Sequence, residues 1–410
     1  MQRDLVVVGG GIIGLAAAWR ALEAGLAVTV LDPVPGDGAT HAAAGMLAPA
    51  TEAEFAESAA LHLHLAGASH WLRFAADLEA STGIGVGLRE SGTLTLAYDA
   101  ADAALLRRVV DLHARHQVTS HELTVAEARR HEPLLGQRLA AAAWVPGDHA
   151  VDPRATHRAL CAAVEQHPAG ELVHRSAVHL EQEPGGRVVG VVDDAGHRHR
   201  AGTTLVAAGW ASAPLLAGVR GVSLPVRPVK GQTLRLQADP MLAPTHVVRG
   251  LVQGRPVYVV ARTTASDGPW TGHSELVIGA TSLERPDDRR ADAGGVYALL
   301  RDARVLLPSI DEAALVEVTP RARPTTPDHL PAVGPTDVPG LHLATGHYRN
   351  GILMAPLTAD VVVAGLTGTW FDVGRTAADP AATVAALRAC DPRRFTRQDT
   401  DPRTPDGARP

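Results

Sequence analysis

The sequence predicts an α/β protein made of two units, a nucleotide-binding domain on a mainly parallel sheet and an α+β domain built on an antiparallel sheet. Three apolar strands that run into glycine turns, near residues 5–8, 203–212 and 341–356, predict the first unit. Stretches that alternate apolar and polar residues lie between them and predict antiparallel strands with one exposed face. The 410 residues suffice for two cores, because a single core stops growing at about 250–300 residues.

The N-terminal segment predicts a strand, a glycine turn, a helix and a second strand. The apolar run at 5–8 is the first strand, a helix continues to about Ala24, Gly25 stops it, and the second strand ends at Asp32. The same residues superficially resemble a secretory signal, with a basic start and an apolar run. The strand, turn and helix are the better interpretation.

Further elements follow from local patterns. Amphipathic segments and an Asp-Pro helix start predict helices at 97–115, 124–131 and 152–165. Alternating segments predict antiparallel strands at 92–98, 231–237, 256–262 and 275–282.

The order of these elements predicts that the nucleotide-binding domain is discontinuous. We expect it to comprise residues 1–87, 144–222 and 324–370, and the second domain to comprise 88–143 and 223–323. Residues 371–410 are expected to form a C-terminal tail, partly disordered in its last dozen residues, because it is rich in Asp, Arg, Pro and Thr.

A G-x-G-x-x-G motif lies at the first strand-to-helix turn. Gly9 permits the tight turn, Gly11 lets the backbone approach a diphosphate, and Gly14 allows close helix packing. The N–H groups of the helix N-terminus can bind the diphosphate, while Asp32 can accept hydrogen bonds from a ribose. A dinucleotide is therefore predicted, and this motif alone fits NAD and FAD alike.

Charge, cysteine content and hydropathy argue against several classes of function. Lys and Arg number 38 against 44 Asp and Glu, a formal net charge of −6, which disfavours nucleic acid as the partner. Cys161 and Cys390 match no disulfide or zinc pattern and fit a reducing cytoplasm. We expect no membrane partner, because the chain has no apolar run long enough to span a bilayer.

Several motifs in sequence order carry a resemblance to a known family over roughly residues 4–370: "VVVGGGIIGLAAAW", "AAAGMLAP", "VDPRA", "LVAAGWAS", "PVKGQ", "YVVAR" followed by "VIGAT", "RPTTPDHLPAVG" and "GHYRNGILMAP". The chain resembles the D-amino-acid oxidase family of FAD-dependent amine oxidoreductases and, within it, the glycine oxidases of thiamine biosynthesis. This implies a Rossmann-like FAD-binding domain with noncovalent FAD. It also implies hydride transfer from the α-carbon of a small amino acid to flavin N5, and reoxidation by O2 to give H2O2. The imine product would serve thiazole synthesis, in a protein of more than one subunit.

The resemblance assigns three catalytic or substrate-binding positions. Arg323 matches the arginine that holds the substrate carboxylate with two parallel hydrogen bonds. The alternative is a surface arginine paired with Asp328. Tyr258 matches a tyrosine that donates to the same carboxylate, and on pattern alone a core tyrosine is an equal alternative. Arg349 matches the arginine at the active-site end of the last motif.

Around the flavin the resemblance implies backbone and small-residue contacts. His41 could tether the flavin covalently, but an ordinary loop histidine is the preferred interpretation, and His347 is expected to be a surface or cap residue. The expected cofactor-binding residues are Gly9, Gly11, Ile12, Ile13, Gly14, Asp32, Thr40, His41, Ala43, Ala44, Gly45, Met46, Val178, Ala208, Gly209, Gly346, His347, Arg349, Asn350, Gly351 and Ile352.

The sequence departs from the family pattern beside Arg323. Pro324 is followed by Thr325 where many glycine oxidases have glycine, and "EVTPRA" lacks the expected Trp and Gly. Pocket shape, and with it the preferred amino acid, stays open. A D-amino-acid or sarcosine-type oxidase or dehydrogenase is the close alternative. An RNA-modifying enzyme with this oxidase module would need a basic face, which the net charge of −6 disfavours. A flavoprotein with a purely structural role would not need Arg323 and Arg349.

Overall fold

The first sheet is built around the strand that precedes the glycine turn. The computed structural model describes residues 3–263, 270–366 and 378–399. In this part of the chain β1 (Arg3–Val8) pairs in parallel with β2 (Val28–Leu31) and β11 (Arg198–Val206). The order β17-β18-β11-β1-β2-β8 is extended by the antiparallel strands β10 and β9 next to β11. The remaining strands are β8 (Gly170–Val173), β9 (Ala177–Gln182), β10 (Val188–Asp193), β17 (Ala332–Pro335) and β18 (Leu341–Thr345).

Alanine-rich helices pack on this sheet and bury its largest core. The helix α1 (Ile12–Glu23) lies against α9 (Gly351–Leu366), and both contribute almost wholly buried apolar faces. The long helix α3 (Ser58–Thr82) adds Trp71 and Phe74 to the same core. The other helices of this half are α2 (Ala39–Ala42), α6 (Pro153–Gln166), α7 (Ser212–Leu216), α10 (Pro380–Ala389) and α11 (Arg393–Asp399), with the short η1 (Gly209–Ala211).

The second sheet is antiparallel except for the parallel pair β13 and β4. Its order is β16-β12-β15-β14-β13-β4-β6-β5. Its strands are β4 (Thr93–Ala97), β5 (His121–Leu123), β6 (Ala141–Val145), β12 (Arg227–Ala238), β13 (Val247–Val252), β14 (Arg255–Thr263), β15 (Ser274–Gly279) and β16 (Ala314–Thr325). Helices α4 (Ala100–Arg115), α5 (Val125–His131) and α8 (Ala293–Leu306) accompany it, with η2 (Pro240–Leu242) and η3 (Pro308–Glu312).

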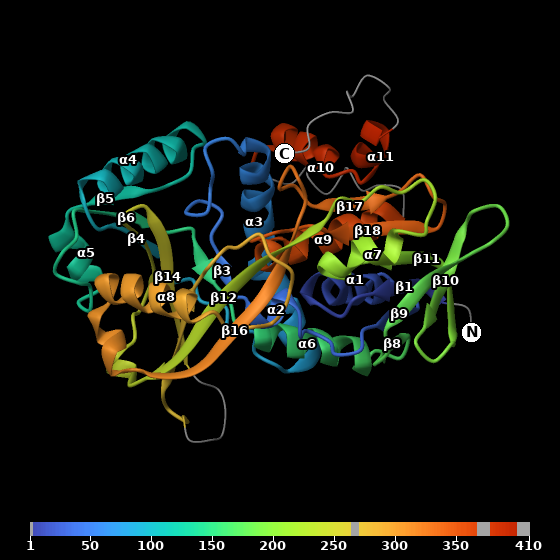
Figure 1. Ribbon diagram of the computed structural model, residues 1–410, viewed down its shortest axis with the longest axis horizontal. Helices are drawn as coiled ribbons and strands as arrows, with labels where there is room; N and C mark the ends of the chain where they lie inside the picture. Colours follow the sequence, from blue (N-terminus) through green and yellow to red (C-terminus); the bar gives the residue numbers. More distant parts are fainter. Residues whose placement is uncertain (1–2, 264–269, 367–377, 400–410) are drawn as a thin grey trace.

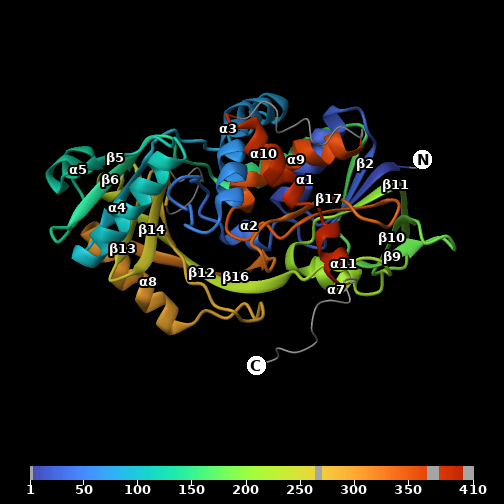
Figure 2. The same cartoon turned by 90° about the horizontal axis from the view of Figure 1, so that it is seen from above.

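The two halves meet along the long strands β12 and β16. Both views show α4, α5 and α8 at one end of the molecule and α1 and β11 toward the other, with these two strands running between them (Figure 1 and Figure 2). A small two-stranded sheet of β3 (Met46–Leu47) and β7 (His149–Ala150) lies beside the first helices. The loops after β1 and β2 therefore face the second sheet.

The predicted pair of sheets, one mainly parallel and one mainly antiparallel, is confirmed. The helix expected at 97–115 begins at Ala100, because Ala97 ends β4 and the Asp99 carboxylate caps the helix by accepting from two backbone N–H groups. The Asp-Pro start is confirmed at α6, where Asp152 is the cap. The helices α3 and α8 and the β9–β10 hairpin were not predicted from the sequence.

The domain division stays a prediction, although the strands of the second sheet follow it closely: β6 and β16 cross its boundaries by two residues each. Within the tail, α10 contributes Ala386 and Leu387 to the main core. The predicted disorder of the last dozen residues falls almost entirely outside the described residues. In the described part of the chain no helix is long and apolar enough to cross a membrane.

Candidate active site

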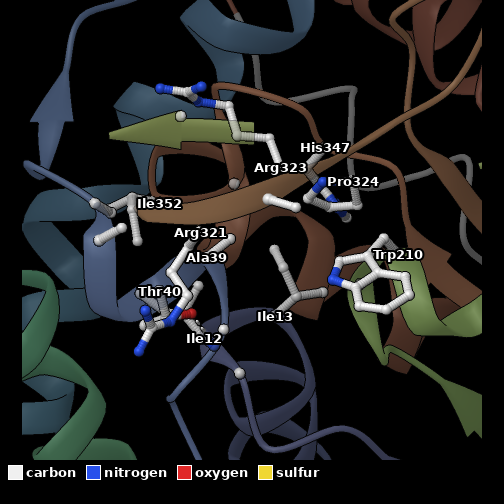
Figure 3. A pocket seen from close by; sticks show the side chains of 18 of the residues that line it. Ile12, Ile13, Ala39, Thr40, Trp210, Arg321, Arg323, Pro324, His347 and Ile352 are labelled. Atoms are coloured by element: carbon white, nitrogen blue, oxygen red, sulfur yellow. Dashed lines mark hydrogen bonds between the residues drawn. The ribbon is translucent and has the colours of Figure 1, made fainter. Parts of the chain in front are cut away.

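A cavity of about 590 Å³ lies where the glycine turn faces the second sheet. The first strand and helix, the loop after β2 and the start of α9 line one side, and residues of β12, β14 and β16 line the other. Figure 3 shows side chains from both halves that point into it. The cavity is therefore continuous from the predicted dinucleotide turn to the predicted substrate residues.

The glycine turn can only be made by glycine at two of its three positions. Gly9 has a φ of +112°, and a Cβ there would lie 2.5 Å from the Ala207 carbonyl oxygen. A Cβ at Gly14 would lie 2.0 Å from the Gly9 carbonyl oxygen, so helix α1 can approach β1 only without a side chain. Gly11 meets nothing closer than the Thr40 hydroxyl at 3.5 Å and lines the cavity. The turn thus leaves a cradle that fits a diphosphate.

Donors and acceptors at this turn also fit a dinucleotide. The Ile12 N–H donates to the Thr40 hydroxyl at 3.1 Å. The N–H groups of Gly11 and Ile13 donate to no acceptor in the described part of the chain. The Asp32 carboxylate accepts from the N–H groups of Gly10 and Val34 and keeps further lone pairs for a ribose. Two N–H donors and the oxygens of one carboxyl group are therefore available to the cofactor.

Two glycines on neighbouring strands make room for the predicted substrate residues. A Cβ at Gly231 would lie 2.1 Å from Nη1 of Arg323, and one at Gly279 would lie 2.1 Å from the Tyr258 hydroxyl oxygen. Arg323 on β16 is opposite Val229 of β12, and Tyr258 on β14 is opposite Gly279 of β15. The glycines of the motifs "PVKGQ" and "VIGAT" thus leave the space that the side chains of Arg323 and Tyr258 occupy.

Arg323 faces the cavity without a carboxylate partner in the described part of the chain. Its Nη1 donates to the Thr281 carbonyl at 3.1 Å. Asp328, the alternative partner, instead binds Arg394 at 2.8 Å, so the interpretation of Arg323 as a surface arginine paired with Asp328 is wrong. A guanidinium held by one carbonyl keeps donors free for an incoming carboxylate.

Tyr258 remains a phenol over the whole physiological pH range. Burial raises its pKa to about 12, while the charge of Arg323 acts in the opposite direction. A protonated hydroxyl can donate a hydrogen bond to a carboxylate that Arg323 holds. The position of Tyr258 in the cavity lining distinguishes it from a core tyrosine.

Arg349 lines the same cavity from the start of α9. Its Nη2 donates to Glu54 at 2.8 Å, and its Nε is buried without a partner. Burial disfavours the charge, but Glu52 and Glu54 outweigh this and raise the pKa of the guanidinium. Arg349 is therefore a permanent cation beside the cavity.

An ion pair that the sequence analysis missed completes the polar lining. Nη1 of Arg249 on β13 lies 2.6 Å from the Glu52 carboxylate, and both residues line the cavity. Burial raises the pKa of Glu52, but Arg249 and Arg349 outweigh it and hold that pKa below its usual value. Arg249 is opposite Tyr258 in the strand register, and no short sequence pattern indicates its contact with Glu52.

Most of the predicted cofactor-binding residues line the cavity, and five do not. Gly14 lies beneath the turn, and Gly346 and Asn350 flank the α9 start without lining it. The Val178 side chain is 52% exposed, and its neighbours Ser176 and Ala177 line the cavity instead. The lining residues are Gly9, Gly11, Ile12, Ile13, Asp32, Thr40, Ala43, Ala44, Gly45, Met46, Ala208, Gly209, His347, Arg349, Gly351 and Ile352.

His41 lies outside the cavity in a polar cluster. Its Nε2 lies 2.9 Å from Nη2 of Arg154 and 3.5 Å from the Glu317 carboxylate. Arg154 in turn donates to Glu317 at 2.7 Å. This cluster joins α2 and α6 to β16, which is a packing role. A covalent link from His41 to a flavin gains no support from this position.

The expectation that His347 is a surface or cap residue is wrong, because this side chain is 5% exposed. Its Nε2 lies 2.9 Å from the Thr358 hydroxyl of α9. Burial lowers the pKa of His347 to about 3. Gly346 makes the turn before it with a φ of +81°, and Tyr348 stacks on His329. His347 is therefore packed into the fold against α9.

The burial of His347 makes the stability of the fold depend on pH. An unfolded histidine titrates near pH 6.5, whereas His347 stays neutral in the fold to about pH 3. Below pH 6.5 the unfolded chain binds a proton that the folded chain does not. The free energy of unfolding is therefore highest above pH 6.5 and decreases as the pH is lowered toward 3. At pH 5 the loss from this residue is expected to be roughly 2 kcal/mol.

Urea unfolding at pH 7 and pH 5 measures this effect in wild type and His347→Gln. We expect the difference between the two pH values to shrink in the variant by up to about 2 kcal/mol. The exposed His179 provides the control, and His179→Gln should keep the wild-type difference. An equal pH dependence in wild type and His347→Gln would show that His347 titrates normally in the fold.

Comparison with known proteins identifies the family. The model of the family "FAD dependent oxidoreductase" matches residues 4–364. The chain belongs to this family. FAD is therefore its cofactor, as predicted, and the resemblance to the D-amino-acid oxidase family is confirmed. Noncovalent binding stays a prediction.

Relatives within the family are named glycine oxidase. The glycine oxidase of Geobacillus kaustophilus is 35% identical over 88% of this chain and 91% of its own. A crystal structure of the glycine oxidase from that species has a TM-score of 0.80 at 32% identity, covering 90% of this chain and 95% of that one. The "Bifunctional protein ThiO/ThiG" of Nostoc sp. is 33% identical over 88% of this chain and 52% of its own. The chain therefore spans about half the length of the bifunctional relatives.

Proposed function

We propose that the protein catalyses the FAD-dependent oxidative deamination of glycine and other small amino acids, with O2 as electron acceptor. The observation that carries the proposal is an unpaired guanidinium, Arg323, beside the protonated Tyr258 in a cavity that continues to the glycine turn. The named relatives that share most of their length with the chain are glycine oxidases. FAD supplies a two-electron acceptor when it is bound.

The residues of this chain bind and orient the substrate. Arg323 and Tyr258 hold its carboxylate, which leaves the amine and the α-carbon to face the cofactor. Arg349 and Arg249 raise the affinity for an anionic group, and Glu52 cancels part of their charge. Among the described residues no group of three or more His, Cys, Asp or Glu could hold a metal ion. We propose that catalysis rests on orientation and electrostatics.

A related substrate class is the second candidate. Five arginines line the cavity, namely Arg249, Arg289, Arg321, Arg323 and Arg349, more than the single carboxylate of glycine requires. An iminodiacetate oxidase from Chelativorans sp. has a similar structure, with a TM-score of 0.77 at 26% identity. A D-amino acid or an N-substituted glycine such as sarcosine is therefore the alternative substrate.

We further propose that the imine product enters thiazole synthesis in thiamine formation. The "Bifunctional protein ThiO/ThiG" relatives motivate this proposal. The two cysteines of this chain are unpaired thiols, which supports a cytoplasmic location.

Peroxide release from the purified yellow protein tests the proposal. Glycine, sarcosine, D-alanine and D-proline are supplied at equal concentrations, and peroxide is measured with a coupled peroxidase. Peroxide from glycine is the expected result. Peroxide from D-alanine or D-proline and none from glycine would assign the enzyme to D-amino acids. No peroxide from any of the four compounds would contradict both the glycine and the D-amino-acid proposals.

Gly231→Ala tests the carboxylate site without removing a charge. The new methyl group would lie 2.1 Å from Nη1 of Arg323 and push the guanidinium away. We expect KM for the amino acid to rise at least fivefold, a loss of about 1 kcal/mol, with little change in kcat. Gly218→Ala, which meets nothing within 4 Å, is the matched control. A KM equal to that of the control would show that the guanidinium does not bind substrate where it lies.

A further inference from the structure

Arg321 is a buried cation that the proposed reaction does not use. It lies on β16 two residues before Arg323, in the segment that departs from the family pattern, and it lines the cavity. Its side chain is 14% exposed. Figure 3 shows it extending toward Thr40 and Ile12, in a different direction from Arg323. The end of the cavity that it reaches is therefore the glycine turn.

Asp37 fixes the direction of this guanidinium. Nε of Arg321 donates to the Asp37 carbonyl and Nη2 donates to its carboxylate, both at 2.6 Å. Nη1 donates to the Pro320 carbonyl at 2.7 Å. Asp37 lies three residues before Thr40, whose hydroxyl accepts from the first N–H of α1. Three hydrogen bonds and a short loop thus place the positive charge beside the N-terminus of α1.

Asp37 is shared between two arginines. Asp37 also pairs with Arg289 from the segment between β15 and α8, and Arg289 lines the cavity too. Burial raises the pKa of Asp37, but the two arginines outweigh this and lower it, so the carboxylate is ionised at neutral pH. Arg289 also lies 3.9 Å from the Asp287 carboxylate, whereas among the described residues Arg321 forms an ion pair only with Asp37. Arg321 therefore shares its carboxylate partner with a second cation.

We propose that Arg321 binds the diphosphate of FAD and that Asp37 is its positioning residue. The diphosphate carries two negative charges, which the helix N-terminus alone offsets only in part, since its dipole is worth roughly half a charge. Arg321 supplies a full charge and a planar set of donors. The strand that carries the substrate arginine thus also contributes to cofactor affinity. This inference rests on the FAD cofactor and not on the identity of the substrate.

Cofactor affinity of the apoprotein tests the inference without any turnover. FAD is titrated into wild type, Arg321→Ala and Arg321→Gln while flavin fluorescence is followed, and ADP is titrated as a competitor. ADP contains the adenosine and the diphosphate but no flavin. Arg304→Ala is the control, because Arg304 pairs with Asp311 in an exposed arginine–aspartate contact.

We expect both Arg321 variants to bind FAD and ADP at least tenfold more weakly, the size of one charge-assisted hydrogen bond. FAD affinity in wild type should also fall more steeply with salt than in the variants, and Arg304→Ala should behave as wild type. Arg321→Gln removes the charge but keeps a polar side chain with an N–H donor, so it carries the test if the alanine variant does not fold. Unchanged ADP affinity in Arg321→Gln would overturn the proposal.

Discussion

Arg323→Ala is expected to raise KM for the amino-acid substrate at least tenfold. The guanidinium donates to one carbonyl in the protein, at 3.1 Å, and keeps its other donors for the substrate. A hydrogen bond to a charged group contributes about 1.5–3 kcal/mol, and tenfold corresponds to about 1.4 kcal/mol. Steady-state kinetics with varied glycine measures the effect.

Two further variants make this result specific. Arg323→Lys keeps the charge but loses the planar fork and should fall between wild type and alanine. Arg394→Ala removes an arginine that pairs with Asp328 outside the cavity, and its KM should stay within about twofold of wild type. If the KM values of Arg323→Ala and Arg394→Ala both equalled that of wild type, the substrate carboxylate would not bind to Arg323.

Gly14→Ala is expected to abolish FAD binding. The added methyl group would lie 2.0 Å from the Gly9 carbonyl oxygen. Overpacking against movable side chains already costs about 1–3 kcal/mol, and here the opposing atom is backbone of the turn itself. We expect FAD to bind at least a hundredfold more weakly, or about 2.8 kcal/mol, so that the variant is purified colourless.

Absorbance after dialysis against FAD, together with the melting temperature, measures this outcome. Gly294→Ala is the control, because Gly294 lies in α8 and a Cβ there meets nothing within 4 Å. That variant should be as yellow as wild type. A yellow Gly14→Ala protein with wild-type FAD affinity would mean that α1 can move away from β1 at little cost.

The glycine turn and its function could be predicted from sequence because local rules determine both. Gly9 and Gly14 are required by contacts between residues close in sequence or on paired strands, and Asp32 follows β2 directly. The N-cap aspartates Asp99 and Asp152 each accept from the N–H groups of the second and third residues after them, so short-range patterns located α4 and α6.

The remaining features depend on contacts that no short pattern encodes. Glu52 and Arg249 are 197 residues apart and meet through the loop that faces β13. The expectation of a surface or cap residue at His347 fails because α9 provides Thr358 as a buried partner. Arg321 lies in the segment "EVTPRA", which departs from the glycine oxidase pattern, and its partner Asp37 is 284 residues away in the sequence. In each case the tertiary contact, and not the local composition, determines the environment.

Anaerobic reduction of the bound flavin by glycine tests the central claim most directly. Glycine is mixed with the yellow holoprotein of wild type and of Arg323→Ala without oxygen, and the flavin absorbance is followed. Wild type should be bleached by glycine, and Arg323→Ala should need at least tenfold more glycine for the same rate. A holoprotein that keeps its colour at every glycine concentration would contradict the proposed oxidation of glycine.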